Sequence, residues 1–291
     1  EAYGRHVAEF ARLQKPVHVA IDFANGMGIW EVKALKGLIT WDGLYEEPDG
    51  RFPNHEANPL HHATLAELQA KVRAGGYAFG VAYDGDADRA GFVDERGEII
   101  PMDLITALIA QDVLATRKGV IFYDLRSSWV VKETIEAAGG TPMMSRVGHA
   151  FIKQQMREHD ALFAGELSGH YYFKDNFTAE SSSLAILSLA NIVSKSDCPL
   201  SALIAPLRKY VASGEINTQV TRDPKAILDE LRAAYAEGRV FELDGVSVEY
   251  ADWWFNVRCS NTEPLVRLNL EARTAALMTA KRDEILAIIR K

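Results

Sequence analysis

Three aspartates at alternate positions, Asp84, Asp86 and Asp88, follow the apolar run at residues 77–81, and Arg89 comes directly after them. Alternate side chains of an extended loop point to the same side, so the three carboxylates can meet. Like charges at such short range repel one another unless a cation lies between them. Because hard cations such as Mg²⁺ prefer carboxylate oxygen, the sequence predicts a cation site here.

An EF-hand is one alternative for this loop, because Asp84, Asp86, Asp88 and Glu95 would fill its ligand positions. An EF-hand loop needs a glycine where Arg89 stands, and helices flank it, whereas the flanks here have the pattern of strands. The other alternative is a solvated acidic turn in which Arg89 forms a salt bridge with an aspartate.

A second polar loop, at residues 165–170, has the sequence Gly-Glu-Leu-Ser-Gly-His. It joins an apolar run at 161–164 to an aromatic run at 171–173. Glu166 and Ser168 alternate along this loop, so both side chains can hydrogen-bond to neighbouring hydroxyls of a sugar. A polar hairpin turn without a ligand is the alternative interpretation.

A third loop, at residues 258–264, has the sequence Arg-Cys-Ser-Asn-Thr-Glu-Pro, and Arg267 follows it. A guanidinium beside Ser, Asn and Thr donors suits the oxygens of a phosphate group. The alternative is a turn between two strands that its serine and asparagine stabilise.

The elements that must position these loops fall into three blocks, predicted as domains at residues 1–101, 102–210 and 211–291. In the first two blocks strands and helices alternate, and polar loops follow the carboxyl ends of strands, which is the doubly wound α/β pattern. The third block has a run of strands and a final helix, which predicts an α+β domain. The expected fold is two successive three-layer α/β domains followed by a C-terminal α+β domain with an antiparallel sheet.

Apolar periodicity and breaker residues give the expected bounds of the single elements. Asp223 and Pro224, for example, are typical of a helix N-cap and first helical position. Helices are predicted at 1–13, 30–38, 64–74, 102–116, 128–138, 181–193, 224–236 and 274–289, and strands at 16–23, 77–81, 119–125, 161–164, 215–221, 240–243, 246–250, 253–259 and 266–271.

The composition argues against several classes of function. The formal net charge is -8 and lysines and arginines form no run, so no nucleic-acid or anionic membrane partner is expected. No apolar stretch reaches the roughly 18 residues of a membrane-spanning helix, and the first residues lack a signal-peptide pattern. The two cysteines, Cys198 and Cys259, lie in unrelated sequence contexts and indicate no disulfide framework, so a cytoplasmic location is expected.

Together the three loops resemble those of the α-D-phosphohexomutases, and within them the phosphomannomutase/phosphoglucomutase branch, over essentially the whole length of the chain. That family has Asp-Gly-Asp-Gly-Asp-Arg in its second domain, Gly-Glu-Met-Ser-Gly-His in its third and Arg-x-Ser-Asn-Thr-Glu-Pro in its fourth. Ala87 and Leu167 replace a glycine and the methionine of this pattern.

The resemblance implies a role for each matching residue. Asp84, Asp86 and Asp88 would bind Mg²⁺ as the cofactor, and Arg89 and Arg126 would act at the transferring phosphoryl group. The implied contacts to the hexose phosphate substrate are His149, Glu166, Ser168 and His170 on the sugar and Arg258, Ser260, Asn261, Thr262 and Arg267 on its non-reacting phosphate.

The implied activity is an intramolecular phosphotransfer that interconverts hexose 1-phosphate and hexose 6-phosphate, through an enzyme phosphoserine and a bisphosphorylated sugar. The family's first domain carries this serine in a Thr-Ala-Ser-His-Asn-Pro loop, which residues 1–291 do not contain. We therefore expect the chain to correspond to domains two to four, to need the phosphoserine domain as a partner, and to be inactive alone.

The substrate expected from the resemblance is mannose or glucose phosphate. The phosphoglucosamine branch often has Gln at the position of Leu167, so the apolar residue favours the other two sugars. The alternatives are a phosphoglucosamine mutase and a non-catalytic fragment that binds sugar phosphates.

Overall fold

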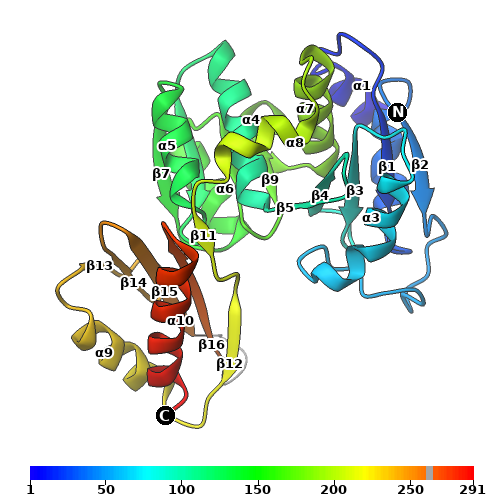
Figure 1. Cartoon of the computed structure of the whole chain (residues 1–291). Coiled ribbons are helices and arrows are strands. Elements are labelled where there is room, and N and C mark those ends of the chain that lie inside the picture. The colour runs from blue at the N-terminus through cyan, green and yellow to red at the C-terminus, as the bar shows by residue number, and fades with distance from the viewer. Residues whose placement is uncertain (260–264) are drawn as a thin grey trace.

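The fold consists of two mixed β-sheets that share a layer of helices and of a C-terminal antiparallel sheet with helices on one face (Figure 1). The computed structural model describes residues 1–259 and 265–291. The predicted fold class is confirmed, with two α/β regions followed by an α+β region.

The first sheet has the strand order β2-β1-β3-β4-β5. β1 is parallel to β2 and β3, whereas β4 and β5 continue the sheet antiparallel, so the sheet is mixed. Helix α3 (Ala66–Arg73) covers one face with Leu68 and Val72. The strands are β1 (His18–Asp22), β2 (Thr40–Leu44), β3 (Phe79–Tyr83), β4 (Ala90–Asp94) and β5 (Ile99–Ile100).

The second sheet has the strand order β10-β9-β8-β6-β7 and repeats the topology of the first. β6 is parallel to β7 and β8, and β9 and β10 follow antiparallel. The polar loops after β3 and after β8 therefore occupy equivalent positions in the two sheets. The strands are β6 (Val120–Asp124), β7 (Thr141–Ser145), β8 (Phe163–Gly165), β9 (Tyr171–Phe173) and β10 (Ala179–Glu180).

A shared helical layer fills the space between the two sheets (Figure 1). Helix α7 (Ser182–Lys195) contacts both β4 and β9, and α4 (Met102–Thr116) packs beside it. Both helices are buried over most of their length, as expected for helices that are apolar all round. Helix α5 (Trp129–Ala137) completes this layer, and α6 (His149–Glu158) covers the outer face of the second sheet.

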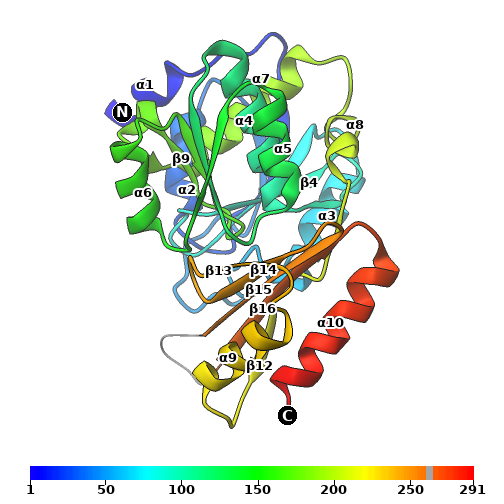
Figure 2. The same ribbon diagram turned by 90° about the vertical axis from the view of Figure 1, so that its left-hand side faces the viewer.

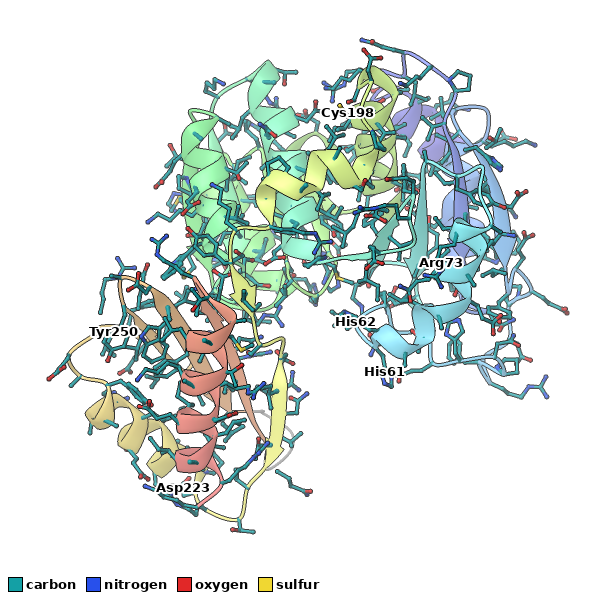
Figure 3. The ribbon with its side chains drawn as sticks, in the orientation of Figure 1. His61, His62, Arg73, Cys198, Asp223 and Tyr250 are labelled. Carbon is teal, nitrogen blue, oxygen red and sulfur yellow. The ribbon has the colours of Figure 1, made fainter. Side chains whose placement is uncertain are left out.

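The C-terminal sheet has the order β11-β16-β15-β14-β13, with β12 also paired to β16. Helices α9 (Pro224–Ala234) and α10 (Ala275–Ile289) cover the face that points away from the α/β regions (Figure 2). Asp223, labelled in Figure 3, caps α9 as predicted. The strands are β11 (Val211–Ala212), β12 (Ile216–Gln219), β13 (Arg239–Phe241), β14 (Val246–Glu249), β15 (Trp253–Cys259) and β16 (Leu265–Ala272).

The N-terminal elements differ from the prediction. Helix α1 covers only Ala2–Ala8, because the side chain of Asn191 in α7 forms hydrogen bonds with the backbone of the residues that follow the helix. Its amide Nδ2 donates to the Phe10 carbonyl at 2.9 Å, and its Oδ1 accepts from the Arg12 N–H at 2.7 Å. The remaining short helices are α2 (Gly28–Glu31), α8 (Leu200–Ile204) and the 3₁₀ turns η1 (Val32–Leu35), η2 (His62–Leu65), η3 (Lys174–Asn176) and η4 (Ala205–Leu207).

Both cysteines are free thiols. Cys198 is exposed at the upper end of the molecule in Figure 3, and Cys259 ends β15. Within the described part of the chain, no helix is long and apolar enough to cross a membrane.

Candidate active site

The three predicted metal ligands lie together in the loop after β3. One carboxylate oxygen from each of Asp84, Asp86 and Asp88 lies within 4.8 Å of the other two. Asp84 is fully buried at the end of β3, whereas Asp86 is exposed. Arg89 closes the loop, with its backbone N–H 3.1 Å from Asp84 Oδ1 and its Nε 2.5 Å from Asp84 Oδ2. The spacing of oxygens and their chemistry fit a divalent cation.

The charge state of the loop reflects this unequal burial. Burial raises the pKa of Asp84 to about 6, although the Arg89 guanidinium acts in the opposite direction. The hydrogen bond from His170 lowers the pKa of Asp88. A buried carboxylate beside two others is costly without further positive charge, which supports a bound cation at this position.

Neighbouring segments fix the backbone of the loop at residues 84–89, which is called the metal loop below. Ser182, at the start of α7, donates its hydroxyl to the Ala87 carbonyl at 2.9 Å. Ala87 has φ 67°, in the left-handed region that favours glycine, and its buried methyl group packs into the shared core. On the other side, the Met27 N–H donates to the Gly85 carbonyl at 2.9 Å. A Cβ at Gly26 would lie 2.7 Å from that oxygen, so a side chain cannot be accommodated there.

The loop after β8, at residues 165–170, lies against the metal loop. The Ala90 N–H donates to the Gly169 carbonyl at 3.1 Å, and His170 Nε2 donates to Asp88 Oδ2 at 3.2 Å. The other ring nitrogen of His170 is 3.0 Å from Ser168 Oγ. The predicted sugar-binding and metal-binding loops are thus joined by direct hydrogen bonds.

Glu166 is buried behind this contact. The Tyr172 hydroxyl donates to Glu166 Oε1, which also lies 3.6 Å from His170 Nδ1. Burial opposes protonation of His170, but the hydrogen bond to Asp88 and the charge of Glu166 outweigh it, so the pKa of His170 is raised. The imidazole therefore donates to the Asp88 carboxylate through Nε2 and lies within ion-pair distance of Glu166 on its other side.

A buried ion pair at the end of β6 continues the network. Asp124 accepts from the Arg126 N–H at 2.7 Å, and Arg126 Nη2 donates to its second carboxylate oxygen at 2.7 Å. The same oxygen accepts from the Leu167 N–H at 2.7 Å, which links the pair to the loop at residues 165–170. Burial alone would raise the pKa of Asp124, but the Arg126 charge outweighs it and the pKa is lowered.

Three guanidinium groups surround the carboxylate of Glu215, which lies between β11 and β12. Arg258 Nη2 is 2.7 Å from Glu215 Oε2, and Arg126 Nη1 is 3.4 Å from the same oxygen. Arg267 Nη1 is 3.5 Å from Oε1. Burial would raise the pKa of Glu215, but Arg258 and the other two arginines outweigh this effect and lower it.

Some predicted site residues are not joined to this network. His149 is exposed at the start of α6, after Gly148 at φ 127°, and no hydrogen bond to the other predicted residues connects it within the described chain. Ser260, Asn261 and Thr262 lie outside the described residues. Their roles stay predictions.

Sequence reasoning missed two acidic residues that hold the arginines. Asp124 could have been found, because an Asp-x-Arg sequence at the end of a strand places both side chains on one side. Glu215 had no such signal, since it lies 89 residues from Arg126 in the sequence.

Models of the phosphoglucomutase/phosphomannomutase family match almost the whole chain. The α/β/α domain II model matches residues 1–97, the α/β/α domain III model residues 101–210 and the C-terminal domain model residues 215–288. The three metal-, sugar- and phosphate-loop motifs fall one in each of these segments.

Similar proteins carry corresponding names. A phosphomannomutase of Methanocaldococcus jannaschii is 41% identical over 276 residues, which is 94% of this chain and 61% of the relative. A phosphoglucomutase/phosphomannomutase family protein from Burkholderia thailandensis has a solved structure with TM-score 0.89 and 32% identity, covering 99% of this chain and 63% of that one.

A more distant structure shares the fold alone. Aspergillus fumigatus N-acetylphosphoglucosamine mutase, solved with GlcNAc-6P and magnesium, has TM-score 0.70 at 16% identity, covering 100% of this chain and 68% of its own. The present chain spans less than two thirds of the length of the M. jannaschii and Burkholderia relatives. On the family models and the relatives together, the chain belongs to the phosphoglucomutase/phosphomannomutase family.

Proposed function

We propose that the chain supplies the metal-, sugar- and phosphate-binding parts of a mutase that interconverts the 1- and 6-phosphates of mannose or glucose. The observation that supports this most is a series of hydrogen bonds that joins the loops at residues 84–89 and 165–170 to Arg126, Glu215 and Arg258. It runs from Asp88 through His170 to the sugar-binding loop, and from Leu167 through Asp124 and Arg126 to Glu215. A single ligand with two ends can therefore be held between the metal loop and the arginines.

Each group in this site has a proposed task. A magnesium ion held by Asp84, Asp86 and Asp88 would offset negative charge on the phosphoryl oxygens. Arg89 and Arg126 would face the transferring group, while His149, Glu166, Ser168 and His170 bind sugar hydroxyls. The distal phosphate would be held by Arg258, Arg267 and the predicted donors Ser260, Asn261 and Thr262.

The phosphoryl donor is proposed to be a phosphoserine in a domain outside these 291 residues. The phosphoryl group would pass from the serine Oγ to the free hydroxyl of the sugar phosphate, and the other phosphate would then pass from the sugar back to serine. The bisphosphorylated sugar must turn over between the two transfers, so the groups that hold the distal phosphate must accept the sugar in either orientation.

Turnover tests the proposed reaction. Protein made with the phosphoserine domain should convert mannose 1-phosphate or glucose 1-phosphate to the 6-phosphate in the presence of Mg²⁺, and residues 1–291 alone should not. Absence of turnover by the longer protein would contradict the proposed reaction. Turnover by residues 1–291 alone would contradict the need for a phosphoserine domain.

Leu167 bears on the choice of sugar. Its backbone N–H donates to Asp124 and is not free for the ligand. Its side chain is apolar and has no hydrogen-bond donor. We propose higher kcat/KM for mannose and glucose 1-phosphates than for glucosamine 1-phosphate. A preference for glucosamine 1-phosphate would favour the phosphoglucosamine alternative instead.

A further inference from the structure

Glu215 lies at the junction between the α/β regions and the C-terminal sheet. It precedes β12 and follows β11, and both of these strands pair with β16. Its carboxylate meets one guanidinium from the loop after β6 and two from the C-terminal sheet, at the distances given above. No other acidic side chain among the described residues contacts arginines from both regions of this site.

The two sheet arginines need such a carboxylate. Arg258 and Arg267 are direct partners in the register of β15 and β16, and like charges directly opposite one another destabilise a strand pair. Arg126 brings a third positive charge to the same carboxylate, and both it and Arg258 are less than one tenth exposed. Water therefore screens these charges poorly.

The three arginines are not held equally. Arg126 has its own partner, because Asp124 accepts from its backbone N–H, Nε and Nη2. In the described part of the chain, Glu215 is the one acidic partner of Arg258 and of Arg267. The orientation of the sheet arginines relative to Arg126 thus depends on this carboxylate.

We propose that Glu215 is a positioning residue, which holds Arg258 and Arg267 in a fixed arrangement beside Arg126, so that the two sheet arginines are oriented for the distal phosphate of the ligand. This inference rests on the proposed function. Glu215 itself does not touch the phosphate, since carboxylate and phosphate repel one another. Its contribution is that the guanidinium groups are oriented before the ligand binds, so less ordering is needed on binding.

Titration calorimetry of residues 1–291 with mannose 1-phosphate in the presence of Mg²⁺ tests the proposal. Glu215→Gln should weaken binding about tenfold or more, which corresponds to about 1.4 kcal/mol. Glu215→Asp should restore part of the loss, because it keeps the charge. Glu242→Gln is the matched control, since it removes an exposed carboxylate that pairs with Arg232 in the same sheet region, and should leave binding unchanged. Equal or tighter binding by Glu215→Gln overturns the proposal.

A second measurement does not depend on the ligand. Arginine side-chain N–H signals, observed by NMR with ¹⁵N-labelled arginine, should exchange faster with water for Arg258 and Arg267 in Glu215→Gln and not in Glu242→Gln. Unchanged exchange of these signals overturns the positioning role. If the unsubstituted chain binds no mannose 1-phosphate, the proposed substrate is wrong, and the NMR comparison still decides the role of Glu215.

Discussion

Three chemically identical side chains in the metal loop have different surroundings. Asp84 is buried against Arg89, Asp88 accepts from His170, and Asp86 is exposed with no hydrogen bond to the described residues. Asp84 and Asp88 therefore support the loop as well as offering oxygens to a cation. Asp86 is the predicted ligand whose removal should weaken cation binding and leave the loop intact.

Substitution of Asp86→Asn is expected to weaken Mg²⁺ binding by about tenfold or more, because the site loses one of its charged oxygens. The free energy of unfolding without metal should change by less than about 0.5 kcal/mol. Titration calorimetry and urea unfolding measure the two quantities. Asp197→Asn, at another exposed aspartate, is the control, and equal Mg²⁺ affinity in both variants would rule out Asp86 as a ligand.

Gly169→Ala is expected to separate the metal and sugar loops. Gly169 has φ 94°, and an added Cβ would lie 3.2 Å from the Ala90 carbonyl and 2.8 Å from Met102 Sδ. The expected loss is about 1–3 kcal/mol in the free energy of unfolding, measured in urea. Gly50→Ala is the control, because no atom lies within 4 Å of its Cβ position. Similar effects of both substitutions would contradict this reasoning.

The residues of the site could be predicted where the signal is local. The alternate aspartates and the Glu-x-Ser spacing are visible in the sequence, and the structure places both loops at the carboxyl ends of equivalent strands. The bonds between loops could not be predicted, since His170 and Asp88 are 82 residues apart and meet only through packing of the two sheets. Glu215 was missed for the same reason.

At the scale of elements, the N-terminus of α5 connects the α/β regions to the C-terminal sheet. Glu271 of β16 accepts from the Trp129 N–H and from Trp254 Nε1, both at 3.0 Å and both with the same oxygen. The Trp129 indole donates to Glu249 of β14 at 2.9 Å. Glu271 of the sheet thus accepts a backbone N–H from the first turn of a helix in the neighbouring region, and Glu249 binds the side chain of the same residue.

Burial raises the pKa of Glu271 above its ordinary value of 4.5, although hydrogen bonds from Ser128, Trp129 and Trp254 act against this. A raised pKa in the folded state means that stabilisation from protonated Glu271 is complete below about pH 4.5 and is lost as the pH rises through the raised value. Glu271→Gln keeps an oxygen acceptor without the charge. Its free energy of unfolding should therefore rise relative to the unsubstituted chain between pH 4.5 and 8.

Urea unfolding across this pH range measures the difference. Glu284→Gln is the control of opposite sign, because the hydrogen bond from Lys281 lowers the pKa of Glu284. The stability that this variant loses should be constant above pH 4.5 and should shrink only as the pH falls below that value. A difference for Glu271→Gln that does not vary with pH would show that Glu271 has no raised pKa in the folded chain.

The bounds of helices and strands could be predicted where the residues of the element itself determine them. Helix α4 has the predicted bounds 102–116, because its apolar run begins after Pro101 and continues without a breaker. Helix α1 ends before its predicted limit because of a side chain from α7, which no local pattern reveals. The strands β2 and β4 were not predicted, since β2 contains Asp42 and Gly43, and β4 directly follows the metal loop.

At the scale of the whole molecule, the chain has one core that spans both mixed sheets and a separate core under the C-terminal sheet. The first core includes residues of β1, β3, α4, α7 and β8. The second lies between the antiparallel sheet and the helices α9 and α10. The predicted domain boundary near residue 101 therefore crosses a continuous core, whereas the one near residue 210 lies between two cores.

We expect residues 1–210 to unfold as one cooperative unit and residues 211–291 as another. Calorimetry of the chain should show two transitions, and a fragment of residues 1–210 should retain the first one. A fragment of residues 1–101 should not unfold cooperatively, because it lacks the α4 and α7 side of its sheet. A cooperative transition in that short fragment would contradict the shared core.

The buried helix α4 also has a consequence for the synthesis of the protein. Its apolar faces are covered by α5, β8 and α7, all of which come later in the chain. About 80 residues separate the end of α4 from the end of α7, and a ribosome that adds roughly 5–20 residues per second needs about 4–16 seconds to make them. During that interval the nascent chain exposes an uncovered apolar helix, which makes the growing polypeptide a natural client for chaperones that bind such segments.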